Sequence, residues 1–171
     1  TNHDVKAVEY YLKELFGVEM GQASEFIHFG LTSQDINNTA VPMMIRDAVT
    51  HVMLPALHEI IGRLCELASD WRSIPMLAHT HGQPASPTTL GKEIAVYAER
   101  LIRQRDLLST IPWSAKFGGA TGNFNAHHVA YPDINWNDFG NSFIHGLGLH
   151  RSQITTQIEH YDHLAAVFDN W

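Results

Sequence analysis

The chain has 171 residues, of which 44% are hydrophobic and 17% are charged, and its formal net charge is −7. This balance predicts a folded domain with a sizeable core and argues against a nucleic-acid partner, because such partners are bound by clustered Lys and Arg. No apolar run is long enough to cross a bilayer and no signal peptide is visible, so we expect no membrane association and a cytoplasmic location.

The ends of the chain and its single cysteine give two further expectations. The chain begins without methionine in a helical pattern and stops at Trp171 in another, so we expect a piece excised from a larger protein. Cys65 stands alone, which excludes an internal disulfide. It lies in an apolar helical pattern, so we expect a buried, reduced thiol.

The first half of the chain reads as helices. One helix is predicted at 4–15, where apolar residues recur at three- and four-residue steps. A long helical stretch follows at 38–71. Pro42 fits its first turn, and Pro55 falls inside it, so we expect a kink or a break near Pro55.

The second half alternates irregular segments with helices. "RSIPMLAHTHGQP" is predicted to be extended or irregular, and Ser86 followed by Pro87 fits an N-cap and the first position of a helix. The segment 112–155 reads as loop-rich, with a short helix near 138–147. "TQIE" fits a capping box, so the last helix is predicted to start near Thr156, with Glu159 three residues on.

No alternation of apolar residues persists anywhere in the sequence. We therefore predict an all-α fold, a segment of a long-helix bundle.

The stretch "LAHTHGQPASP" leaves three interpretations open. His79 and His81 could be loop residues that make ordinary hydrogen bonds. They could bind one metal ion, but a zinc site needs a third ligand, and only unplaced candidates such as Asp35, Glu93 or His127 are available. Alternatively, one histidine could be a general acid, because its unperturbed pKa suits proton transfer near neutral pH.

Two further segments combine a helix start with possible anion contacts. In "TNHD" the Thr, Asn and Asp residues are typical of a helix N-terminus, which leaves His3 unexplained. In "LTSQDINN" Thr32 and Asp35 fit a capping box, while Thr32 and Ser33 are neutral donors suited to a carboxylate or phosphate, with His28 just upstream.

The glycine-rich stretch "GGATGN" lacks the Lys-Ser/Thr of a P-loop and does not form GxGxxG after a strand, so we interpret it as a flexible loop. Gln157 by itself is uninformative. Taken together, polar helix ends that carry histidines and hydroxyl groups suit the binding of a multiply charged anion and the movement of a proton.

Five segments carry a family resemblance: "TNHDVKAVEY", "EFIHFGLTSQDINN", "THGQPASPTTLGKE", "GNFNAH" and "TTQIE". In this order they resemble the adenylosuccinate lyases of the bacterial type, within the fumarase/aspartase superfamily. "HFGLTSQD" and "THGQP" resemble two of the three superfamily signature regions. "TNHDVKAVEY" and "NFNAH" favour this branch over argininosuccinate lyase, fumarase or aspartase.

The resemblance implies a β-elimination in purine and AMP biosynthesis. Adenylosuccinate gives AMP and fumarate, and the related succinyl-carboxamide ribotide gives its amide and fumarate. A base removes a proton from the carbon next to a carboxylate, preorganised donors stabilise the carbanion, and an acid protonates the leaving nitrogen. The family implies no metal and no organic cofactor.

The resemblance also assigns residues by motif match. His81 resembles the general acid, and Thr32 and Ser33 resemble a pair that binds near the succinyl carboxylates. His79 stands where the family often has Arg, and we interpret it as a structural neighbour of His81. The remaining matches are substrate-binding or site-lining positions: Asn2, His3, Asp4, Thr80, Gln157 and, lining the site, His28.

The family's third signature, a Ser-Ser-x-Met-Pro loop that carries the presumed serine base, does not occur in this sequence. In the family each active site is assembled from three subunits of a homotetramer. We therefore expect residues 1–171 to be a single partial domain, from the end of an N-terminal domain into the central helical bundle, and to be inactive alone.

Three alternatives remain: a sibling lyase such as argininosuccinate lyase, a non-catalytic helical oligomerisation module, and a histidine-rich metal-binding protein.

Overall fold

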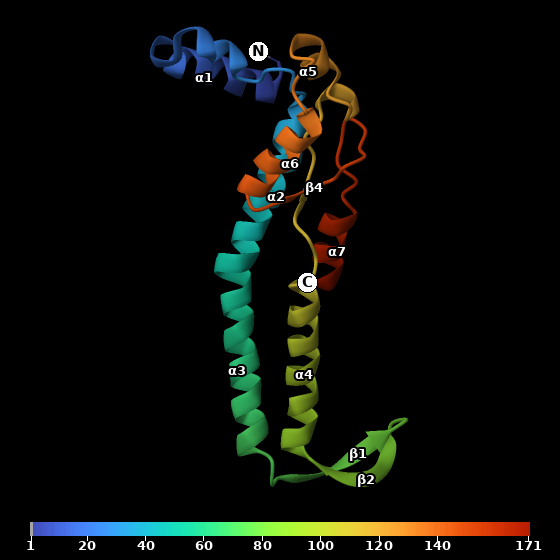
Figure 1. The fold of residues 1–171 in the computed structure, drawn as a ribbon. Helices are drawn as coiled ribbons and strands as arrows, with labels where there is room; N and C mark the ends of the chain where they lie inside the picture. Colours follow the sequence, from blue (N-terminus) through green and yellow to red (C-terminus); the bar gives the residue numbers. More distant parts are fainter. Residues whose placement is uncertain (1) are drawn as a thin grey trace. The chain divides into compact units, whose positions relative to one another are not determined.

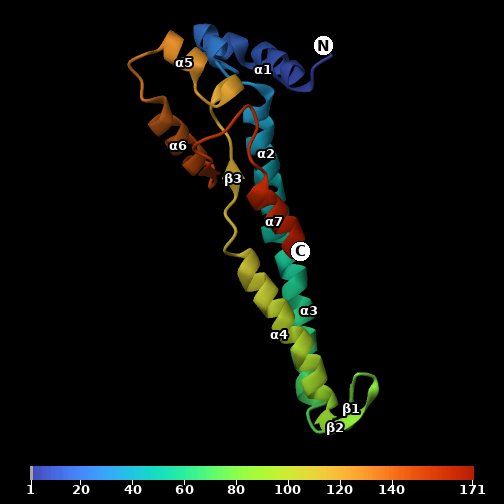
Figure 2. The same ribbon diagram turned by 90° about the vertical axis from the view of Figure 1, so that its right-hand side faces the viewer.

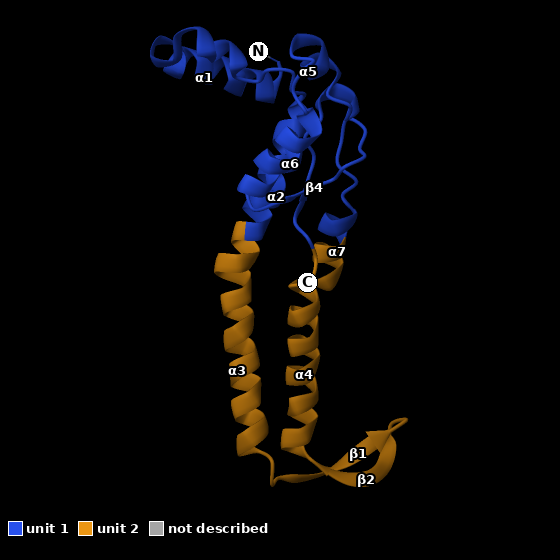
Figure 3. Cartoon of the chain, in the orientation of Figure 1, with its two compact units in different colours: residues 1–46, 112–165 blue, residues 47–111, 166–171 orange. Residues whose placement is uncertain are grey.

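The structure is a computed structural model that describes residues 2–171, and α-helices make up most of both of its compact units (Figure 1). Unit 1 contains the chain up to Arg46 together with Pro112–Ala165, and unit 2 contains Asp47–Ile111 and Ala166–Trp171 (Figure 3).

Unit 1 is built from helices joined by irregular segments. Its elements are α1 (Asp4–Met20), η1 (Gly21–Phe26), most of α2 (Ser33–Ala48), β3 (Ser114–Ala115), η3 (Gly119–Thr121), α5 (Asn125–Ala130), α6 (Trp136–Gly146), β4 (His150–Arg151) and the start of α7 (Asp162–Asn170). The parallel pair β3–β4 joins Ser114 to His150 and Ala115 to Arg151. The core of unit 1 is a cluster of buried residues: Ala115, Phe117, Phe124, Trp136, Ile144 and Leu149.

Unit 2 is a helical hairpin closed by a β-hairpin. Its elements are the π-helical turn η2 (Val49–Met53), α3 (Leu54–Asp70), β1 (Pro75–Thr80), β2 (Gln83–Thr89) and α4 (Leu90–Leu108), followed by the end of α7. Both views show α3 and α4 side by side (Figures 1 and 2). The close contact needs Gly91, where an added Cβ would lie 2.2 Å from the carbonyl oxygen of Ala68.

The predicted helical character is confirmed, with corrections to the first helices. α1 extends to Met20, beyond the predicted end, and its N-cap is His3, whose ring Nδ1 accepts a hydrogen bond from the backbone N–H of Lys6 at 3.3 Å. α2 starts at Ser33, so Pro42 lies inside the helix and not in its first turn. The chain stays helical past Pro55: the π-helical turn η2 precedes α3, and Pro55 lies in the first turn of α3, so the irregularity expected near Pro55 takes the form of a π-helical turn and not of a break.

The all-α fold class is confirmed, and the segment predicted to be extended or irregular belongs to the β1–β2 hairpin. The predicted helix start at Ser86 and Pro87 was wrong. Ser86 and Pro87 lie within β2, and the N-cap of α4 is Thr89, whose hydroxyl accepts from the backbone N–H of Lys92 at 3.3 Å. The sequence pattern does not indicate a strand here, because β2 contains prolines and lacks the alternation of apolar and polar residues that is typical of strands. An isolated two-stranded hairpin tolerates proline, since both strands are edges.

Two other expectations were also wrong. α7 begins at Asp162, not near Thr156, and Glu159 is buried in the irregular segment before it, where its carboxylate accepts a hydrogen bond from the hydroxyl of Ser152 at 2.6 Å. Cys65 is exposed on α3, although its helical pattern predicted a buried thiol. The short helix predicted at 138–147 is confirmed as α6.

Candidate active site

The residues assigned from the sequence fall in both units. Those in unit 1 are Asn2, His3, Asp4, His28, Thr32, Ser33 and Gln157, whereas Thr80 and His81 lie in unit 2. Asn2, His3 and Asp4 form the exposed start of α1. The ring of His3 caps α1, and this contact gives a structural role to the one residue of "TNHD" that the helix-start pattern did not explain.

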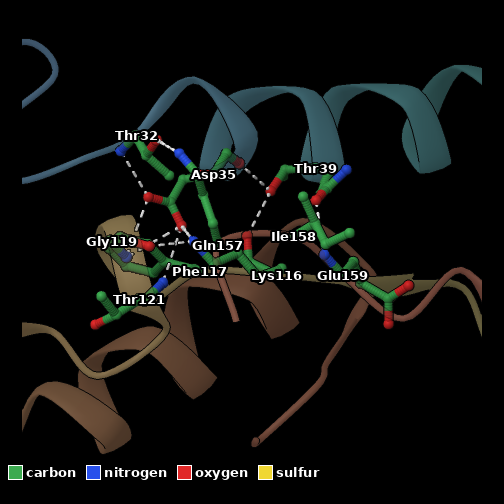
Figure 4. A network of polar contacts seen from close by, with 12 residues as sticks. Thr32, Asp35, Thr39, Lys116, Phe117, Gly119, Thr121, Gln157, Ile158 and Glu159 are labelled. Atoms are coloured by element: carbon green, nitrogen blue, oxygen red, sulfur yellow. Dashed lines mark hydrogen bonds and ion pairs between the residues drawn. The ribbon is translucent and has the colours of Figure 1, made fainter. Parts of the chain in front are cut away.

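The structure brings together two assigned residues that are 125 positions apart. The side-chain Nε2 of Gln157 donates a hydrogen bond to Oγ1 of Thr32 at 3.1 Å (Figure 4). Gln157 lies in the irregular segment that precedes α7, and Thr32 directly precedes α2. The sequence alone gave no means of pairing them.

The Thr32–Gln157 contact lies at the N-terminus of α2. Ser33 is the first residue of this helix, and both Thr32 and Ser33 are half-buried. The unpaired N–H groups and the dipole of a helix N-terminus favour an anion at this position. The hydroxyl groups and the amide therefore form a polar group suited to a carboxylate.

The capping box predicted at this helix is confirmed for the side chain of Asp35, whose Oδ2 accepts the backbone N–H of Thr32 at 2.8 Å. The same carboxylate also accepts the backbone N–H groups of Gly118, at 2.9 Å, and Gly119, at 3.2 and 3.1 Å. Asp35 is thus more than a cap, because it binds a second segment of the chain.

Lys116 completes this network and was missed by the sequence reasoning. Its ammonium lies 2.7 Å from Oδ1 of Asp35, with side chains 0% and 1% exposed, and it also donates to the carbonyl of Gly119 (Figure 4). A buried carboxylate and ammonium require each other, since either charge alone is costly to remove from water.

His81 occupies the turn of the β1–β2 hairpin. The register pairs Thr80 with Gln83, which leaves His81 and Gly82 as the connecting residues, with φ of 55° and 77°. Two consecutive positive φ angles are typical of a type I′ hairpin turn. The side chain of His81 is exposed, and His79 lies on β1 opposite Pro84.

A left-handed backbone at a non-glycine residue is uncommon, and two of the three assigned histidines have it. His81 has a φ of 55° and His28 a φ of 64°. Such conformations persist where the surrounding structure enforces them, and they gather at functional sites. At His81 the two-residue hairpin turn itself requires this conformation, so the role suggested by the motif stays a prediction.

His127 is a buried titratable residue that the motif assignments did not use. Its ring is 1% exposed, and its Nδ1 has no hydrogen-bond partner within residues 2–171. Burial lowers the pKa of His127, opposed by the charge of Asp35 and a backbone hydrogen bond to Phe29. The ring therefore favours its neutral form.

A cavity of about 680 Å³ adjoins His127 within unit 1. Its walls are mainly aromatic and include Phe29, Tyr131 and Trp136. Neither Thr32 nor Gln157 lines it. The cavity borders the start of α2 through Leu31 and Asp35, although its walls do not include the side chains of the Thr32–Gln157 contact.

Across residues 2–171, no three or more His, Cys, Asp and Glu side chains are grouped so that they could hold a metal ion. Asp35, one of the candidate third ligands, is bound to Lys116 and to backbone N–H groups. The same part of the chain contains no helix with the length and apolar character needed to span a membrane.

Comparison with known proteins supplies the family. Residues 1–170 match the family model described as "Lyase". The chain belongs to the lyase family. The resemblance to adenylosuccinate lyases is also confirmed, because this lyase-family chain is 53% identical to the adenylosuccinate lyase of Dictyostelium discoideum over 176 residues and 47% identical to that of Escherichia coli K12 over 171 residues.

Each comparison covers 99% of this lyase-family chain but 38% of the relative, so the chain spans well under half the length of these curated relatives. Two solved structures are similar. A fumarate lyase from Mesorhizobium sp. BNC1 has a TM-score of 0.75 at 27% identity, covering 94% of this chain and 37% of the other. A 3-carboxy-cis,cis-muconate lactonizing enzyme from Pseudomonas putida has a TM-score of 0.76 at 23% identity, and the match covers 95% of this chain and 36% of the other. This likeness supports the fold alone.

Proposed function

We propose that this chain contributes to an adenylosuccinate lyase, which releases fumarate from adenylosuccinate to give AMP, and from the related succinyl-carboxamide ribotide to give its amide. The observation that carries the proposal is the contact between Thr32 and Gln157 at the N-terminus of α2. These two residues were assigned to substrate binding from separate motifs, and the fold joins them at a position suited to a carboxylate.

The proposed reaction is a β-elimination. A base takes a proton from the carbon next to a carboxylate, and the carbon–nitrogen bond then breaks as the new carbon–carbon double bond forms. The electron pair of the broken bond goes to the leaving nitrogen, which takes a proton from a general acid. The resemblance places the base on a Ser-Ser-x-Met-Pro loop, a pattern that residues 1–171 do not contain.

His81 is proposed as the general acid. A histidine changes protonation state near neutral pH, and the hairpin turn holds this one exposed and in a fixed backbone conformation. Thr80, its neighbour on β1, is proposed as a substrate contact. His79 is proposed to support the hairpin without taking part in the chemistry.

Thr32 and Ser33 are proposed to bind near the succinyl carboxylates, with Gln157 as a further contact and His28 lining the site. Asn2, His3 and Asp4 are proposed as a substrate-binding segment. No metal or organic cofactor is proposed. Following the family, the active enzyme is proposed to be a cytoplasmic homotetramer in which three subunits build each site.

The test uses the complete gene product with His81→Asn, and with His79→Asn as the matched control in the same hairpin. Release of AMP from adenylosuccinate and binding of the substrate are measured in parallel. We expect His81→Asn to lower turnover by about 10²- to 10⁴-fold with binding retained, which is the usual contribution of a general acid.

His79→Asn should change turnover far less. Near-normal turnover of the His81→Asn enzyme would assign the acid to another residue. An unmodified enzyme that does not convert adenylosuccinate would contradict the proposed function itself.

A further inference from the structure

We propose that the glycine loop, residues 118–122, is a positioning element that sets the spacing of Thr32 and Gln157. The sequence predicted only a flexible loop at this place. The inference rests on the proposed function, because it assigns to the loop the placement of two proposed substrate contacts. All residues concerned lie in unit 1.

At its first end the glycine loop is fixed by the carboxylate of Asp35. That carboxylate accepts the N–H groups of Gly118 and Gly119, and its Oδ2 also accepts the N–H of Thr32 at 2.8 Å. One buried acid thus holds both the glycine loop and the backbone of Thr32. The charge of this acid is balanced by Lys116, two residues before the loop, whose ammonium nitrogen lies 2.7 Å from Oδ1 of Asp35.

At its other end the glycine loop lies against the segment that carries Gln157. Gly122 has a φ of +81°, and a Cβ added there would lie 2.3 Å from the carbonyl oxygen of Thr155 and 2.8 Å from its hydroxyl. Only glycine allows this approach. The contact fixes the backbone two residues before Gln157.

The loop itself is compact. Residues Gly119–Thr121 form a 3₁₀ turn, and the N–H of Gly122 donates to the carbonyl of Gly119 at 3.3 Å. A Cβ added to Gly118 would lie 2.8 Å from the carbonyl oxygen of Gly122, so the two ends are in direct contact. The glycines therefore permit close approach of backbone segments, and the loop acts as a spacer of fixed size.

These contacts connect Thr32 and Gln157 by two routes. Along one route, Thr32 is bound by Asp35, Asp35 binds the glycine loop, and the loop contacts Thr155, two residues before Gln157. The other route is the direct 3.1 Å hydrogen bond from Gln157 to Thr32. Beyond Gln157, the N–H of Glu159 donates to Oδ1 of Asn38 on α2 at 2.8 Å. Gln157 is consequently held on both sides, and displacement of the loop would alter one side only.

The test is Gly122→Ala in the complete gene product, with Gly146→Ala as the matched control. Gly146 ends α6, and an added Cβ there meets nothing within 4 Å. We expect Gly122→Ala to raise the KM for adenylosuccinate about tenfold and to change kcat less than about threefold, because contacts made equally in the ground state and the transition state act on KM. Gly146→Ala should leave both parameters unchanged.

A second comparison separates positioning from general damage. If the glycine loop acts through Gln157, then Gly122→Ala should add little to KM once Gln157→Ala is present. A crystal structure of the Gly122→Ala enzyme should show Thr32 Oγ1 and Gln157 Nε2 beyond hydrogen-bond distance. Should Gly122→Ala fail to fold, Gly119→Ala takes its place. The Cβ added there would lie 3.2 Å from the carbonyl oxygen of Gly30 and 4.0 Å from Cε1 of His127, although the φ of +75° adds strain.

Two results would overturn the inference and leave the proposed function in place. One is an unchanged KM in a loop variant that folds. The other is that Gly122→Ala raises KM as much in the Gln157→Ala enzyme as in the unmodified enzyme. Absence of turnover by the unmodified enzyme would instead overturn the proposed function, and the inference would fall with it.

Discussion

Removing one partner of the buried Asp35–Lys116 ion pair should destabilise the protein, and the two possible removals should differ in cost. Asp35→Asn leaves an ammonium that is 0% exposed without an opposite charge beside it. Loss of one partner of a buried pair costs about 3–5 kcal/mol. The new amide also points its N–H₂ group at backbone N–H groups, so the upper part of that range is expected.

Lys116→Met leaves a carboxylate that still accepts the N–H groups of Thr32, Gly118 and Gly119. Hydrogen bonds to a charged group contribute about 1.5–3 kcal/mol each, so these three offset much of the lost Coulomb energy. Methionine also fills most of the space of the lysine stem. We therefore expect a loss of about 2 kcal/mol, clearly below that of Asp35→Asn.

The assay is urea denaturation of the complete gene product, followed by far-UV circular dichroism, for each single variant and for the double variant Asp35→Asn/Lys116→Met. The double variant should lose less stability than the sum of the two single variants, because neither charge is then left unpaired. Equal losses for the two single variants, or an additive double variant, would show that the backbone N–H groups do not compensate the carboxylate.

Three further predictions concern other parts of the chain. Thr89→Ala should lower the free energy of unfolding by about 1 kcal/mol, because it removes the N-cap of α4, whereas Ser86→Ala on β2 should leave it nearly unchanged in the same denaturation assay. His127→Gln should flatten the dependence of the unfolding free energy on pH below the unfolded pKa of 6.5, and His128→Gln, which replaces an exposed neighbour, should not. The sign follows from the lowered pKa of His127: the unfolded chain binds more protons, so stability is lost as the pH falls below the unfolded value of 6.5 and is retained above it. Residues 1–171 expressed alone should release no AMP from adenylosuccinate in a coupled assay, because the loop that carries the presumed base is not in this sequence; turnover by that purified chain would contradict the prediction.

Local signals predicted the helical fold well where short-range chemistry determines the structure. The 3.6-residue periodicity located the helices, and the spacing of Thr32 and Asp35 predicted the acid's hydrogen bond to the start of α2. Near Pro55 the helix is irregular, with a π-helical turn directly before α3, although it is not broken. In each case the residues that decide the conformation are within a few positions of one another.

Tertiary contacts decided the positions where prediction failed. The spacing of Thr156 and Glu159 fits a capping box, but the buried carboxylate of Glu159 accepts hydrogen bonds from Ser152 and from the backbone N–H of Tyr161, and no helix starts there. The hairpin was missed because its signal is the His81–Gly82 turn and not an alternating strand pattern. The exposure of Cys65 was missed because a broad apolar pattern does not identify which face of a helix is covered.

Proline at position 42 shows how a local rule and a distant contact combine to build the candidate site. Because Pro42 has no N–H, the carbonyl of Asn38 lacks its usual partner within α2, and it accepts instead the backbone N–H of Lys116 at 3.4 Å. That bond places Lys116 beside α2, where its side chain reaches Asp35. Pro42, which the sequence suggested for the first turn of a helix, thus leaves the carbonyl of Asn38 free to bind the segment that leads into the glycine loop.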